Sequence, residues 1–145
     1  MNCENKCVQL FDQKVNMPNV ECIELMFNMQ KSLQDHLASK GKALDLNNAS
    51  FKERVDGLTI QFRNLLLEFG ELMERLPYKE WKTYSPEQMK DFLDEESKIE
   101  SWYEIIDMWH FFMNMCLLMG IDGKTFVHLY MTKNKENFDR QKRGY

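Results

Sequence analysis

The apolar segment from Ser101 to Met119 (SWYEIIDMWHFFMNMCLLM) constrains the fold of this chain more than any other feature. Its only formally charged residues are Glu104 and Asp107, which are three positions apart and therefore lie on one face of a helix. An isolated carboxylate taken out of water is so costly that it normally neutralises, pairs or binds a cation. The segment therefore predicts a buried helix whose two acids share one counter-charge.

A second acidic pair, Glu68 and Glu71, has the same spacing in another apolar stretch, FRNLLLEFGELMERL. At about 100° per residue the two acids fall between two apolar sectors, which predicts that they are shielded from solvent. Carboxylates without thiols or a histidine cluster favour Mg²⁺, with Mn²⁺ as the alternative. Because Mg²⁺ commonly completes its shell with substrate phosphate oxygens, the expected substrate is a phosphate ester or anhydride attacked by a metal-activated water.

Length and composition favour a single all-α domain formed by residues 1–145. A chain of 145 residues buries about two-thirds of its unfolded surface, which is enough for one compact core. It has only three prolines and six glycines, and no stretch alternates apolar and polar residues long enough to predict a sheet. We therefore expect an antiparallel helical bundle with a four-helix core.

Capping residues and helix breakers predict where the helices begin and end. Ser85 is a candidate N-cap, with Pro86 at the first helical position and Gln88 completing a capping box. Asp122 is a second candidate N-cap, and residues 85–100 are a candidate helical segment between the two acidic pairs. The expected helices cover residues 1–15, about 20–39, about 51–76, 86 to 119 with a break near 95–97, and 123 to the carboxyl end.

Charge argues against nucleic-acid and membrane partners, and the cysteines indicate the cellular location. A net charge of −4 gives no general attraction to nucleic acid or anionic lipid, so we expect neither as a partner. Two acids, a histidine and an asparagine within the apolar segment would be expensive in a bilayer. Four cysteines without a leader-like segment at the amino end favour a reducing, cytoplasmic location.

Three segments resemble the successive motifs of one known family. They are LLLEFGELMERLPYKEWK (65–82), YEIIDMWHFF (103–112) and LYMTKNKENFDRQKRGY (129–145). In this order they resemble the all-α dimeric dUTP pyrophosphatases, which are relatives of the MazG-type nucleotide pyrophosphatases. The resemblance implies a homodimer that hydrolyses dUTP to dUMP and pyrophosphate with Mg²⁺.

The same resemblance implies a role for individual residues. Glu68, Glu71, Glu104 and Asp107 match the metal-binding carboxylates, and Glu68 and Glu71 are the expected catalytic acids, Glu68 also orienting or deprotonating water. Where the family usually has an asparagine after the base-reading glutamine, this chain has Gln34. The residues that match substrate-binding positions are Gln30, Trp81, His110, Phe111, Lys133, Asn134, Asn137, Arg140 and Gln141.

Two other functions are compatible with the same residues. The first keeps the fold and changes the base, giving a pyrophosphatase for dCTP or a modified deoxynucleotide. The second is a non-catalytic helical interaction module whose acids bind a structural cation or a basic peptide. Most of the single residues also have a purely structural interpretation. Core packing would explain His110, Phe111 and Trp81, and a solvent-exposed helix face would explain Lys133 and Arg140.

Overall fold

The computed structural model describes residues 19–144, and within them the chain forms five helices and no strand. The helices are α2 (Glu21–Ser39), α3 (Phe51–Glu74), α4 (Pro86–Leu93), α5 (Glu95–Leu118) and α6 (Gly123–Lys142). The predicted all-α class is confirmed, and the four long helices are those expected for the core. The helix expected within residues 1–15 lies outside the described residues.

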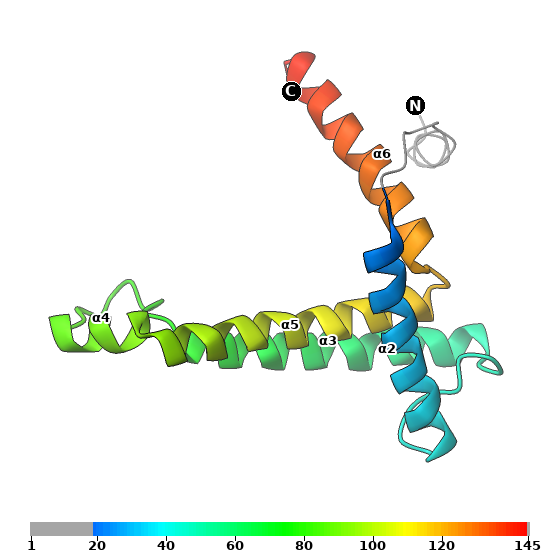
Figure 1. Ribbon diagram of the computed structural model, residues 1–145, viewed down its shortest axis with the longest axis horizontal. Coiled ribbons are helices and arrows are strands. Elements are labelled where there is room, and N and C mark those ends of the chain that lie inside the picture. The colour runs from blue at the N-terminus through cyan, green and yellow to red at the C-terminus, as the bar shows by residue number, and fades with distance from the viewer. Residues whose placement is uncertain (1–18, 145) are drawn as a thin grey trace.

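The central unit is an antiparallel pair formed by α3 and α5, which lie side by side along their length (Figure 1). Helices α2 and α6 pack against each other and cross this pair near the carboxyl end of α5, and α4 packs on the other end of α5. Each acidic pair lies on one member of the α3–α5 unit. The antiparallel pairing therefore determines that the two acidic pairs face each other.

Side-chain caps set the helix starts. Ser85 accepts a hydrogen bond from the backbone N–H of Gln88 in a capping box, and Asp122 caps α6, both as predicted. The break before the apolar helix falls at Asp94 and not within 95–97. The reason is local, because the Asp94 carboxylate accepts from the backbone N–H of Ser97 and so begins a new helix.

A small core lies where α2, α5 and α6 meet. Phe27 of α2 and Met113 of α5 are each 2% exposed, and Phe126 of α6 packs against them. At the start of α6, Gly123 approaches α2 so closely that a Cβ atom there would lie 2.8 Å from the Cα atom of Glu24. Only glycine permits this approach of the two backbones.

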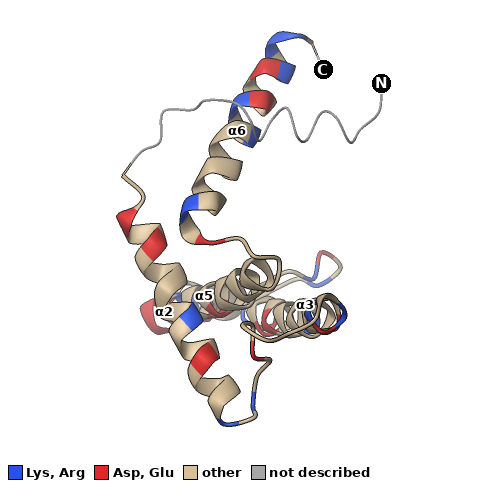
Figure 2. Ribbon diagram, turned by 90° about the vertical axis from the view of Figure 1, so that its right-hand side faces the viewer, with Lys and Arg blue, Asp and Glu red and all other residues tan. Residues whose placement is uncertain are grey.

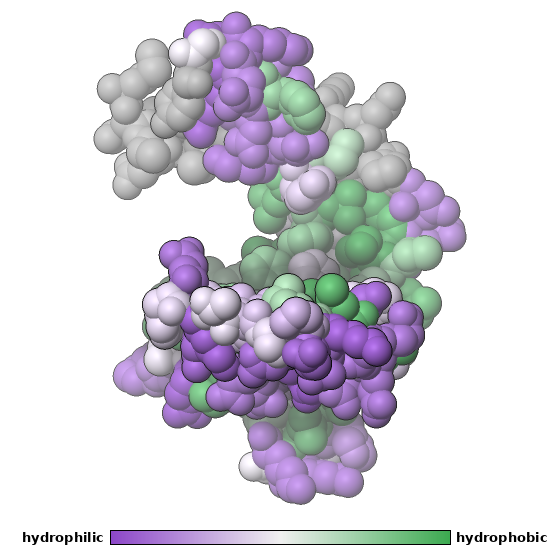
Figure 3. Space-filling view, turned by 90° about the vertical axis from the view of Figure 1, so that its left-hand side faces the viewer, coloured by the Kyte–Doolittle hydropathy of each residue, from purple (hydrophilic) through white to green (hydrophobic). Residues whose placement is uncertain are grey.

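The broad apolar face predicted for α3 is not covered by the helices of residues 19–144. Phe62 and Leu66 are 52% and 50% exposed, and on α5 Trp102 and Ile105 are 58% and 50% exposed. The space-filling view shows further hydrophobic side chains in the recess between α6 and the α3–α5 pair (Figure 3). The expectation that this α3 face is core is therefore wrong for the single chain, because among the described helices only α5 packs closely along α3.

None of the helices within residues 19–144 is by itself both long and apolar enough to cross a membrane. Helices α5 and α6 pass that test only when they are taken together, and they are bent by 99° at the break between them. That break contains Gly120, whose φ of +75° belongs to the left-handed region that glycine adopts readily.

Candidate functional site

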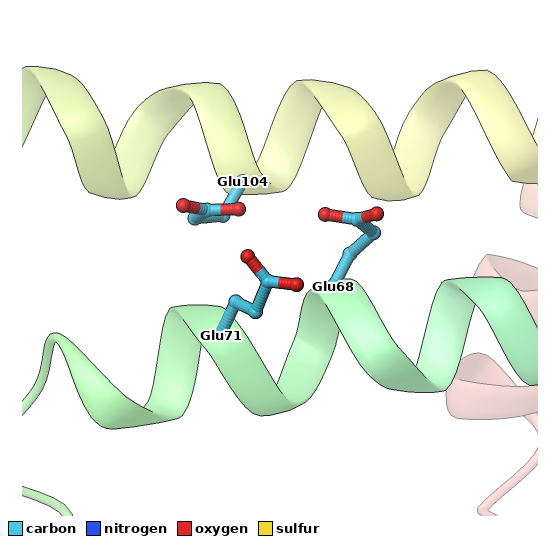
Figure 4. Close-up of side chains that lie close together, drawn as sticks. All are labelled: Glu68, Glu71 and Glu104. Carbon is cyan, nitrogen blue, oxygen red and sulfur yellow. The ribbon is translucent and has the colours of Figure 1, made fainter.

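Three carboxylates meet between α3 and α5. Glu68, Glu71 and Glu104 each have an oxygen atom that lies within 4.8 Å of the others, and Figure 4 shows their side chains converging from the two helices. Glu104 is only 8% exposed and Glu68 is half-buried. Glu71 is exposed, contrary to the prediction that both acids of α3 are shielded, because α5 is the only one of the described helices that packs closely along α3.

Negative charge accumulates at this cluster, as the behaviour of Glu68 shows. Burial raises the pKa of the Glu68 carboxyl group, and the nearby charges of Glu71, Asp107 and Glu104 raise it further. Carboxylates that disfavour one another's ionisation are stabilised by a shared cation. The chemistry of the donors, all hard carboxylate oxygens, therefore fits Mg²⁺ or Mn²⁺.

Asp107, the fourth expected ligand, lies beside the cluster and not within its three-way contact. It is close enough to raise the pKa of Glu68, and its Oδ1 atom lies 3.6 Å from Nδ1 of His110. Both residues are half-buried on the same side of α5. The role of Asp107 as a metal ligand stays a prediction.

Arg75 is a neighbour of the site that the sequence motifs did not indicate. Its Nε atom donates to Oε1 of Glu104 at 2.8 Å, and its Nη1 atom pairs with the carboxylate of Glu100. Glu104 therefore has a counter-charge, although its own apolar segment contains no lysine or arginine. Because Arg75 comes from the end of α3, only the pairing of α3 with α5 reveals this contact.

The expected base-side residues occupy different surroundings. Gln30 is 5% exposed and donates a hydrogen bond to Asn114 of α5. Phe111 lines a cavity of about 290 Å³ between α2, α3 and α5. Trp81, in the connection between α3 and α4, is 80% exposed and does not line this cavity.

The expected terminal residues all lie on the second half of α6. This half projects away from the α3–α5 pair and carries alternating basic and acidic residues (Figures 1 and 2). The structure therefore brings together the expected residues of α3 and α5, and it does not bring the terminal set to them within one chain. The terminal set is Lys133, Asn134, Asn137, Arg140 and Gln141.

A family model described as dUTPase matches residues 22–126, which include both acidic pairs. The chain belongs to the dUTPase family. The resemblance seen in the motifs is thus confirmed, and the match ends before the terminal set on α6. No solved structure matches the chain.

Viral relatives of this dUTPase-family chain are similar over most of its length. A dCTP pyrophosphatase of Enterobacteria phage T4 is 31% identical over 140 residues, which cover 85% of this chain and 82% of the relative. A dCTP pyrophosphatase of Enterobacteria phage LZ5 is 31% identical over an alignment of 172 positions, which covers 97% of this chain and 98% of the relative. A DNA replication protein of phage T4 is 28% identical over 130 residues, covering 78% of this chain and 33% of that protein.

Proposed function

We propose that this chain hydrolyses a pyrimidine deoxynucleoside triphosphate to the monophosphate and pyrophosphate with Mg²⁺, Mn²⁺ being able to substitute. The observation that carries the proposal is the convergence of Glu68, Glu71 and Glu104 in a chain of the dUTPase family. dUTP is the substrate that the motifs imply. dCTP is the second candidate, because two relatives that match most of the chain are named dCTP pyrophosphatases.

The carboxylates have separate tasks in this proposal. A bound Mg²⁺ neutralises charge on phosphate oxygens and lowers the pKa of water. Glu68, Glu71 and Glu104 would hold the cation from two helices, and Asp107 is the proposed fourth ligand. Glu68 has the raised pKa of a group suited to taking a proton, so we assign it to orienting and deprotonating the attacking water.

A homodimer would complete the site. The exposed apolar faces of α3 and α5 need a partner, and the second half of α6, which carries basic residues, projects away from the α3–α5 pair of its own chain. We propose that two copies associate through the apolar faces and that α6 of one copy approaches the phosphates bound by the other. Its lysines and arginines then supply a local positive charge that the chain, with a net charge of −4, lacks overall.

The test is pyrophosphate release from a panel of nucleotides, measured with purified protein in Mg²⁺, in Mn²⁺ and in EDTA. The panel contains dUTP, dCTP, dTTP, dATP and the ribonucleotides UTP and CTP. We expect fast release from dUTP or dCTP in Mg²⁺, slower release from the other nucleotides, and none in EDTA. Equal rates on all nucleotides would reject a pyrimidine-specific site, and full activity in EDTA would reject the metal.

A further inference from the structure

A pocket lined by amide side chains lies next to the carboxylate cluster. The cavity of about 290 Å³ is bounded by α2, α3, α5 and the loop at 40–50. Arg54 holds this loop in place, since its guanidinium donates to the backbone oxygens of Leu46 in the loop and Leu118 at the end of α5. We call this cavity the amide pocket, after the four amides in its lining, Gln34, Gln61, Asn64 and Asn114.

Three amides from three helices form a continuous chain of hydrogen bonds at this pocket. Gln30 Nε2 of α2 donates to Oδ1 of Asn114 at 2.8 Å, and Nδ2 of Asn114 donates to Oε1 of Gln61 at 3.0 Å. Gln30 is buried and does not line the cavity, whereas Asn114 and Gln61 do. Gln30 is therefore placed to fix the orientation of Asn114, which in turn fixes Gln61.

We call the hydrogen-bonded chain Gln30–Asn114–Gln61 the amide relay. Its direction determines which donor groups remain for a ligand. The carbonyl oxygens of Asn114 and Gln61 each accept a hydrogen bond within the relay. Asn114 keeps one N–H, and Gln61 keeps both N–H groups of its amide, for other partners. Because both amides line the pocket and are bonded to each other, their remaining donors belong to neighbouring groups at the pocket.

Neighbouring donors distinguish the two pyrimidine bases that the proposed function leaves open. The pairing edge of cytosine has two adjacent acceptors, N3 and O2, next to its amino group. The edge of uracil alternates, with an N–H between two carbonyl oxygens. A pair of adjacent donors thus matches two atoms of cytosine, but places one donor against the N–H of uracil.

We infer that the amide pocket binds the base of the substrate and selects cytosine, with Asn114 and Gln61 contacting N3 and O2 and Gln30 acting as a positioning residue. This inference rests on the proposed function for the identity of the ligand as a pyrimidine nucleotide. The amide of Gln34 or Asn64, whose carbonyl is available at the same pocket, accepts from the amino group.

The position of the pocket suits a nucleotide whose phosphates lie at the carboxylates. Asn64 precedes Glu68 by one helical turn, and Asn114 follows Asp107 by two turns, which is about 10 Å along α5. This separation leaves room for the sugar between base and phosphate. Phe111, one turn after Asp107, lines the same cavity and offers an apolar surface to the base.

The inference is tested by binding, so that it does not depend on turnover. The α,β-imido analogues of dCTP and dUTP, which resist hydrolysis, are titrated calorimetrically in Mg²⁺ into the wild type, Gln61→Leu and Gln61→Glu. We expect the wild type to prefer the cytosine analogue and both variants to lose that preference by about tenfold, since each lacks the Gln61 donors. Gln61→Glu keeps the acceptor for Asn114 and so preserves the relay if the leucine variant folds poorly.

Two controls separate base reading from a structural effect. Asn28→Leu changes an exposed amide elsewhere on α2 and should bind both analogues as the wild type does. Gln61→Leu should bind inorganic triphosphate with unchanged affinity. A wild type that prefers the uracil analogue, an unchanged preference in both Gln61 variants, or a matching loss of triphosphate affinity would overturn the inference. Selective binding without pyrophosphate release would instead reject the proposed function and leave the inference standing.

Discussion

Glu68 is the residue whose surroundings say most about the site. It lies half-buried among three other acids, and the folded chain raises its pKa through burial first and the charges of Glu71, Asp107 and Glu104 next. Arg75 compensates Glu104 at 2.8 Å, whereas a side-chain hydrogen bond between Glu68 and Glu104 adds to the causes that raise the pKa of Glu68. The charged form of Glu68 therefore destabilises the folded chain.

Removing the charge of Glu68 should change the stability of the metal-free protein. Because the pKa of Glu68 is raised above 4.5 in the folded chain, the folded state binds the proton more tightly than the unfolded state. Metal-free wild type should lose stability as the pH rises from 4.5 through the raised pKa. At pH 7 Glu68→Gln should unfold at a higher temperature than the wild type in EDTA.

The same thermal scans contain the control. Adding Mg²⁺ should raise the unfolding temperature of the wild type, because a cation that binds only the folded state stabilises it. The increase should be much smaller for Glu68→Gln. Two outcomes would contradict the claim that the charge of Glu68 destabilises the metal-free protein. They are an equal rise in unfolding temperature with Mg²⁺ in both proteins, and a variant that is less stable than the wild type in EDTA at pH 7.

At the scale of the elements, the helix starts were predictable and the packing was not. Ser85 and Asp122 cap their helices as expected, since a cap depends on residues within one turn. The acidic pairs could likewise be placed on helix faces from their spacing. The contact of Arg75 with Glu104 and the relay from Gln30 to Gln61 could not be predicted, because they join helices whose arrangement local patterns do not determine.

Two glycines test this packing with one substitution each. Gly123→Ala should destabilise the fold by at least about 1 kcal/mol, because the new Cβ atom would lie 2.8 Å from the Cα atom of Glu24 and force α2 and α6 apart. Gly70→Ala, within α3, meets nothing within 4 Å and should stabilise by about 0.5–1 kcal/mol through helix propensity. Urea unfolding followed by circular dichroism measures both changes, and effects of the same sign would contradict this packing.

At the scale of the whole molecule, residues 19–144 of the single chain leave much of their apolar surface uncovered. Phe62 and Leu66 on α3, with Trp102 and Ile105 on α5, are all at least half exposed. The hydrophobic pattern of α3 correctly indicated a face that needs burial, but the sequence could not say whether the same chain or a second one covers it. A second copy fits the proposed function, because it also brings an α6 to each cluster.

Sedimentation velocity tests this association. We expect the wild type to sediment as a dimer at micromolar concentration and Phe62→Glu to sediment as a monomer, because a charge on an apolar interface is costly to bury. Leu93→Glu, which changes a 60% exposed apolar residue at the end of α4, is the matched control and should remain dimeric. A monomeric wild type would contradict the proposed dimer.

The central claim is that the carboxylates between α3 and α5 carry out the reaction, and one comparison tests it most directly. Pyrophosphate release from dCTP and dUTP in Mg²⁺ is measured for the wild type, Glu71→Gln and Glu74→Gln. Glu74 is an exposed acid on the same helix outside the cluster. We predict that Glu71→Gln lowers kcat by about 100-fold or more while Glu74→Gln stays near the wild type. Wild-type turnover by Glu71→Gln would contradict the claim.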